Sequence, residues 1–152
     1  MSMTEFALVG PLFLLFFFGI IVTGIVVANQ MQLTNAVRDG ARAAAICGGA
    51  GTNLKSTNTT LPNGATCSVT DVASYVNNKL VSIPGGINPT VTVTIDGSAN
   101  NPLSSCQAGQ LVEVDGSFAQ PLYLPLIGRF LGDSGNSSIR TLHASAQATC
   151  EQ

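Results

Sequence analysis

The chain opens with a long apolar segment that passes into an amphipathic helical pattern. No charged residue occurs between Phe6 and Val37, and that stretch exceeds the ~20 apolar residues that a membrane-spanning helix needs. Residues 30–45 are rich in helix-forming residues. Apolar side chains recur there at helical spacing: Leu33, Ala36, Val37, Ala41, Ala44 and Ala45. The charged residues fall on the opposite face: Arg38, Asp39 and Arg42.

These two patterns predict one continuous helix over residues 4–46. Such a helix is ~60 Å long, about twice the thickness of a hydrocarbon core. Gly48 and Gly49 are expected to end it. Its second half must therefore pack on the rest of the chain. We expect an N-terminal hydrophobic helix at residues 1–46 and a separate head domain at residues 47–152.

The remainder of the chain predicts one short helix and three strands. A capping-box-like start at Ser68 opens a helix that reaches about Ser82. Residues 90–96, 110–118 and 139–149 alternate between apolar and polar positions, which is typical of half-buried strands. We therefore expect an α+β fold, in which a small antiparallel sheet packs on the long helix. The apolar segment after the second strand, residues 119–136, either covers the sheet or forms a patch that meets another subunit.

Charge excludes several classes of partner. Only 9% of the residues are charged and the net charge is −2, so the basic surface that binds nucleic acid or anionic lipid is missing. The motifs of catalytic serines, phosphate-binding loops and dinucleotide sites do not occur, and we expect no enzyme activity and no cofactor. The single histidine, His143, has no Cys or His at ligand spacing, so we expect no metal site. Glu113 and Asp115 share a strand face, and a solvated face is favoured there over a cation site.

The four cysteines indicate an oxidising compartment. None lies in a CxxC pair, and an even number in a charge-poor domain behind a membrane segment is typical of two disulfides. Of the three possible pairings, Cys47–Cys67 with Cys106–Cys150 is favoured, because each bond ties a loop to the end of a regular element. Four free thiols in a cytosolic domain are the alternative.

Two triplets match the acceptor pattern for N-linked glycans. They start at Asn58 and Asn136. Both asparagines are candidate modification sites, and O-linked decoration of the hydroxyl-rich loops is the alternative.

The first residues do not fit a cleaved signal or a simple anchor. No Lys or Arg precedes Arg38, and the apolar run is too long for a signal peptide. A simple anchor leaves Glu5 unexplained at the membrane edge. It also places the head in the cytoplasm by the positive-inside rule, against the cysteine argument. A basic leader removed before Met1 resolves this conflict.

Two stretches of the sequence resemble a known family. The segments EFALVGPLFLLFFFGI and AVRDGARAAA are similar to the TadE-like proteins of the tight-adherence (Tad/Flp) pilus system, within the class of type IV pilins. Residues 5–11 carry the first match and residues 38–42 the second. The resemblance implies processing by a prepilin peptidase just before Met1 and storage in the inner membrane. It also implies assembly with identical or related pilin subunits into an extracellular helical filament.

The same resemblance assigns roles to residues near the N-terminus. Glu5 is expected to pair with the amine of Met1 on a neighbouring subunit, because a carboxylate at the hydrocarbon edge costs up to ~3 kcal/mol unless it finds a partner. Phe6 starts the apolar helix. Pro11, after Gly10, removes one helical hydrogen bond; it either bends the helix for assembly or lies near enough to the helix start to be tolerated.

The sequence thus predicts a structural pilin subunit, either the main subunit or a minor one. The alternative is a monomeric, single-pass, membrane-anchored binding domain outside the cytoplasm. Adhesion, motility and DNA uptake all remain open as roles of the filament.

Overall fold

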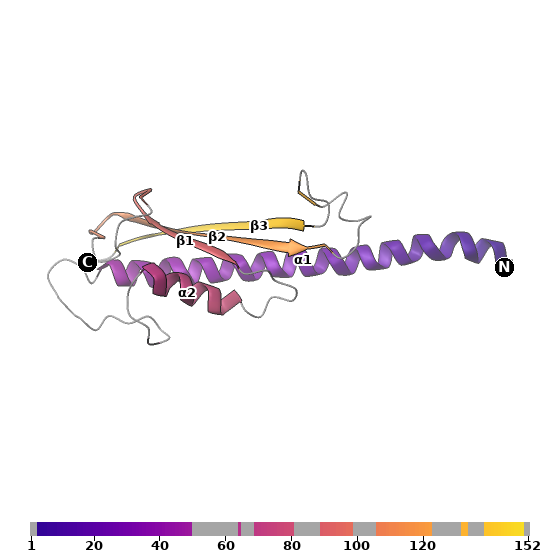
Figure 1. The fold of residues 1–152 in the computed structure, drawn as a ribbon, viewed down its shortest axis with the longest axis horizontal. Helices are drawn as coiled ribbons and strands as arrows, with labels where there is room; N and C mark the ends of the chain where they lie inside the picture. Colours follow the sequence, from indigo (N-terminus) through magenta and orange to yellow (C-terminus); the bar gives the residue numbers. More distant parts are fainter. Residues whose placement is uncertain are drawn as a thin grey trace.

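One helix runs the length of the molecule and carries everything else on its second half (Figure 1). The computed structural model describes residues 3–49, 64, 69–80, 89–98, 106–122, 132–133 and 139–150. Helix α1, Met3–Gly49, contains 47 residues and is uninterrupted at Pro11, which makes it about 70 Å long. The prediction of one continuous helix is confirmed.

A three-stranded antiparallel sheet lies along the second half of α1 (Figure 1). The strands are β1, Thr90–Ile95; β2, Leu111–Pro121; and β3, Ile139–Thr149, and their order in the sheet is β1-β2-β3. The β2–β3 ladder pairs residues one to one from Leu111 with Thr149 to Pro121 with Ile139. Its regular register keeps one face of the sheet toward α1 over the whole length of the pair.

The second helix lies beside α1 and packs against β1. Helix α2, Val69–Leu80, contacts both α1 and β1. It carries Asp71 in its first turn and Lys79 in its last, the arrangement that a helix dipole favours. Val72, Val76 and Leu80 are buried, as the helical spacing predicted. The α+β fold is confirmed: two helices cover one face of an antiparallel sheet.

The core lies between the two helices and the sheet. α1 contributes the predicted stripe, which is buried throughout: Leu33, Ala36, Val37, Ala41, Ala44 and Ala45. β2 contributes Val112, Val114 and Phe118, and β3 contributes Leu142. The small alanines of β3 pack against this cluster, which lets α1 approach the strand closely.

Two glycines set how closely the layers approach. A Cβ on Gly40 would lie 2.3 Å from Val76 Cγ2, and a Cβ on Gly116 would lie 2.7 Å from Val37 Cγ2. Real Cβ atoms do not approach other carbons so closely, so α2 and β2 reach α1 only because both positions lack a side chain.

Some element ends differ from the sequence prediction. β2 continues to Pro121, three residues beyond the expected end at Phe118. Its extra residues pair with β3 and include Gln120, which is buried. β1 ends at Ile95 because Asp96 has a positive φ of 46° and belongs to a turn. Residues 123–131, the main part of the expected apolar patch, lie outside the described residues.

Candidate assembly surface

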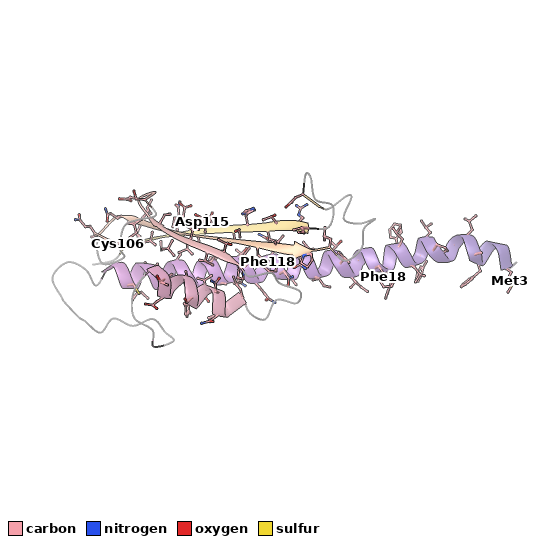
Figure 2. All side chains as sticks on the ribbon, viewed as in Figure 1. Met3, Phe18, Cys106, Asp115 and Phe118 are labelled. Carbon is pink, nitrogen blue, oxygen red and sulfur yellow. A yellow bond between two sulfur atoms is a disulfide. The ribbon has the colours of Figure 1, made fainter. Side chains whose placement is uncertain are left out.

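The first part of α1 is bare except near its end, where Val26 packs against the core. We define the stem as residues 6–27. Its large side chains are exposed in this single chain: Phe6, Leu8, Val9, Leu12, Phe13, Leu14, Leu15, Phe16, Phe17, Phe18, Ile20, Ile21, Ile25 and Val27. Figure 2 shows Phe18 on this free part of the helix, whereas Phe118 lies between the sheet and α1. The segment from Phe6 to Cys47 is, by length and composition, long and apolar enough to cross a membrane.

The stem has the size of a hydrocarbon core. At 1.5 Å per residue it is ~33 Å long, against a core thickness of ~30 Å. Thr23, a polar residue within it, donates its hydroxyl to the Gly19 carbonyl at 2.8 Å. That bond satisfies the hydroxyl inside the helix, so the Thr23 side chain adds no unsatisfied polar group to the apolar surface of the stem.

A pair of buried amides marks the point where α1 leaves the stem. Asn29 and Gln120 are only 1% and 2% exposed, and Asn29 Nδ2 donates to Gln120 Oε1. On the next residue, Gln30 Nε2 donates to the His143 carbonyl at 2.9 Å. These bonds join α1 to the end of β2 that lies nearest the stem and to the backbone of β3. A buried amide must find its partner, so the pair fixes the register of the helix on the sheet.

A hollow of about 600 Å³ lies on one side of the stem. It forms where small residues leave the helix surface low between bulky neighbours. Its lining is Leu15, Phe16, Gly19, Ile20, Thr23, Gly24 and Val27. Low, small-residue surfaces of this kind let a second apolar helix approach closely.

A second hollow, of about 560 Å³, lies at the opposite end of α1, beside β3. Its lining includes Arg42, Ile46, Leu111 and Ala148. Ile46 is 60% exposed and Leu111 is 44% exposed. Outside α1, Leu111 is the one large apolar side chain exposed among the residues that the structure describes.

The outer face of the sheet is polar. It holds Glu113 and Asp115 on β2, and Figure 2 shows Asp115 on the side of the sheet away from α1. Partial burial, and then the nearby charge of Glu113, raise the pKa of Asp115 above 3.8. His143 is exposed on the same face. Within the part of the chain that the structure describes, no three His, Cys, Asp or Glu side chains gather as a metal site.

At the start of β3, one carboxylate holds the chain by hydrogen bonds. Asp133 accepts from the Thr141 amide at 2.7 Å and from its hydroxyl at 2.5 Å. Those bonds lower the pKa of Asp133 below 3.8. The Asp133 amide in turn donates to the Ile139 carbonyl at 3.0 Å.

The disulfides lie at the end of the head far from the stem. Cys106 and Cys150 form a bond, with their Cα atoms 6.2 Å apart, which joins the start of the β2 segment to the end of β3 (Figure 2). This is one of the two expected pairs. Cys47 is also disulfide-bonded, and Cys67 lies outside the described residues.

The remaining predicted positions fall at or beyond the edges of the described chain. Glu5 belongs to α1, whereas its side chain, Met1 and the two candidate glycosylation sites, Asn58 and Asn136, lie outside the described part. Phe6 is exposed at the start of the stem, and Gly10 and Pro11 lie within the continuous helix. The assembly roles of these residues stay predictions.

Sequence reasoning missed the Asn29–Gln120 pair. The available signal was the alternation in β2, because Gln120 has the same parity as the buried Val112, Val114 and Phe118. The sequence prediction ended this strand at Phe118, two residues before Gln120, so the alternation was not followed far enough to include Gln120.

Comparison with known proteins identifies the N-terminal part. A family model described as TadE-like protein matches residues 1–42, which include residues 5–11 and 38–42, the positions that carried the resemblance. No curated protein and no solved structure gives a significant match to the chain. The matched family and the bare apolar stem associate the chain with the Tad pilus, either anchored in the membrane or in the pilus itself. Residues 1–42 are therefore TadE-like, which confirms the resemblance over that part of the chain.

Proposed function

We propose that the chain is a structural pilin-type subunit. The stem holds it in the inner membrane and then carries it into an extracellular Tad/Flp-like filament. The observation that carries this proposal is the division of α1. One unbroken helix is covered by the sheet over its second half only, and it presents an apolar stem on its first half.

The bare stem needs an apolar environment at every stage. An exposed apolar patch on a soluble monomer is rarely larger than a few hundred Å², and a whole bare helix of this kind exceeds that. A bilayer covers the stem of a single subunit, and the stems of other subunits cover it in a filament core. The hydrogen bond between Asn29 and Gln120 keeps the head fixed on α1 both in the bilayer and in the filament.

Glu5 supports assembly over simple anchoring. It is the one charged residue before Arg38, and it lies at the start of α1, where the positive end of the helix dipole favours an anion. We expect its carboxylate to pair with the Met1 amine of a neighbouring subunit. The partners are then identical or related pilin subunits, after a prepilin peptidase has exposed that amine.

The function is tested by following the protein from membrane to filament. Glu5→Ala and Glu5→Gln should both leave the protein membrane-inserted but lower its amount in sheared filaments at least tenfold, because both remove the charge. N-terminal sequencing of the mature protein should read from Met1 after removal of a leader. A protein that keeps an initiator Met1, stays in the membrane and never enters filaments contradicts the proposal. That result favours the monomeric anchored binding domain.

A further inference from the structure

The sheet has two edge strands, β1 and β3, because β2 lies between them. Backbone groups of an antiparallel strand alternate between pointing to the neighbouring strand and pointing away from it. On β3, Asp133 bonds the Ile139 carbonyl and the Thr141 amide. Gln30 bonds the His143 carbonyl. The odd-numbered residues of β3 therefore point away from β2, and the first half of this edge is closed by hydrogen bonds within the chain.

The second half of the β3 edge is open. Its outward residues are Ser145, Gln147 and Thr149, and no residue that the structure describes bonds to their outward amides or carbonyls. Charged residues and prolines commonly protect a sheet edge from pairing, and residues 144–149 contain neither. The hollow of about 560 Å³ beside β3 lies along this half, where Gln147, Ala148 and Thr149 line it. A further strand therefore has room to lie against this edge.

β1 presents the other edge of the sheet. The amide of Asp96, just after the strand, donates to β2 at 2.9 Å, so the odd-numbered residues of β1 point away from β2. Ile95 exchanges backbone bonds with Ser98 across a turn, which closes its groups. The open backbone groups of β1 are therefore those of Val91 and Val93. β1 also contains no charged residue and no proline.

The two open edges match in direction and in level. β1 and β3 both run antiparallel to β2, so they run parallel to each other. The register through β2 places β1 level with residues 143–148 of β3. This is the half of β3 whose edge is open, whereas the closed half has no part of β1 at its level.

We infer that the open edge of β3 pairs with β1 of a second copy of this chain, so that the sheet continues from head to head. This inference rests on the proposed function and adds a contact between heads to it. Copies inserted in one bilayer share one orientation, so β3 and the incoming β1 run parallel, as the directions of the two edges require. The two edges are different surfaces, so the contact is heterologous and repeats without closing on itself.

The open groups select one register for this pairing. In a parallel pair, the outward residue of one strand bonds the carbonyl before its partner and the amide after it. With Val91 opposite Ala146 and Val93 opposite Ala148, every open group of β1 meets an open group of β3. The groups of β3 that take part are the Ser145 carbonyl, the Gln147 amide and carbonyl, and the Thr149 amide.

Pairing at the same level fails at one bond. There Val91 lies opposite Ala144 and directs its amide to the His143 carbonyl, which already accepts from Gln30. The second copy is therefore shifted along β3 from Ala144 to Ala146. At ~3.3 Å per residue this is a displacement of ~7 Å away from the stem. A shift by one residue is excluded, because it would turn the inward face of the incoming strand outward.

The same register extends the apolar layer under the sheet. Val91, Ala146 and Ala148 are only partly buried, and they pack at the border of the core. In the paired sheet the two valines of β1 lie beside these alanines on the inward face, so each copy covers the border of its neighbour. The outward face then brings Thr92 of one copy beside Gln147 of the other, and both are exposed in the single chain.

Disulfide trapping in filament-producing cells tests the contact on the full chain. Thr92→Cys and Gln147→Cys in one chain place two thiols side by side on neighbouring copies. Within a chain the two positions lie on opposite edges with β2 between them, too far apart to bond. Sheared filaments should give a ladder of multimers without reductant and monomers with it, and mass spectrometry should find position 92 linked to position 147.

The matched control is Thr92→Cys with Ser145→Cys. These positions are out of register by ~7 Å between copies, so the ladder should be at least tenfold weaker. Either cysteine alone should give no ladder. A ladder from the control that equals or exceeds the one from positions 92 and 147 overturns the register.

A pair of substitutions at Gln147 provides a second readout, with Thr90→Cys and Ser145→Cys as the in-register thiols. Gln147→Pro removes the outward amide and keeps the bonds to β2, so it should lower this crosslink at least fivefold. Gln147→Ala keeps the amide and should preserve the crosslink. Filaments that form normally without a link between positions 92 and 147, or that link position 147 to a different protein, overturn this pairing and leave the proposed function standing. Absence of the parent protein from sheared filaments contradicts the proposed function itself.

Discussion

Replacing Gly40 by alanine sets two opposing energies against each other. In an exposed helix interior, Gly→Ala gains about 1 kcal/mol of helix propensity. At this position the new Cβ would lie 2.3 Å from Val76 Cγ2 and 3.6 Å from Val114 Cγ1. Val76 is completely buried, so any shift of its side chain must be made within the core.

The steric term is expected to win. Overpacking a well-filled core costs about 1–3 kcal/mol, and a contact this short against a buried side chain belongs at the upper end. Subtracting the propensity gain leaves a net destabilisation of about 2 kcal/mol. For a head of roughly 100 residues this lowers the melting temperature by about 8–16 °C.

The assay is thermal unfolding of the full chain in detergent micelles, followed by circular dichroism. Gly24→Ala is the matched control, because a Cβ there meets nothing within 4 Å in the same helix, and it should leave the transition unchanged or raise it slightly. Gly40→Ala combined with Val76→Ala should lose less stability than the sum of the two single changes. A melting temperature of Gly40→Ala equal to or above that of the parent would show that the close approach of α2 to α1 does not limit the size of the side chain at this position.

Three further predictions concern the contacts that hold the head together. Asn29→Leu leaves Gln120 without its amide partner and should cost about 1–3 kcal/mol in urea unfolding, part of which the double change to leucine at both positions restores. The hydrogen bonds to Asp133 hold its pKa below 3.8, so their stabilisation is complete above that pH and is lost as the pH falls below it. The melting temperature of Asp133→Asn, measured over a series of pH values, should therefore fall less between neutral and acid pH than that of the parent. Removing the Cys106–Cys150 bond, which closes 44 residues, should cost about 4 kcal/mol, and mass spectrometry without reductant should find no free thiol in the parent.

The local patterns of the sequence predicted the elements and their buried faces. The spacing of Leu33, Val37 and Ala44 fixed which side of α1 meets the sheet, because a helix turns by a constant angle per residue. The alternation in the strands did the same for Val112 and Val114. In both cases the information lies within a few residues of the chain, so it can be read without knowing the fold.

Contacts between distant segments could not be predicted in this way. Asn29 and Gln120 are 91 positions apart, and each alone is an ordinary polar residue that prefers water. Only the packed layers make their burial and mutual hydrogen bond necessary. Gly40 gave a partial signal, since glycine weakens a helix interior, but the neighbour that requires it is on α2.

The second segment of the TadE-like match divides its residues between two surfaces. Gly40 and Ala41 face the head, where Ala41 is 2% exposed, while Arg38 and Arg42 lie on the opposite side of the same turn and are exposed. Because the two sets point in opposite directions, their effects are separable. Gly40→Ala should lower the melting temperature of the isolated subunit. Replacing both arginines with glutamine should leave that temperature unchanged, because both side chains are exposed. A large loss of subunit stability from the arginine changes would show that these side chains support the head as well, so that the two sets of residues do not act separately.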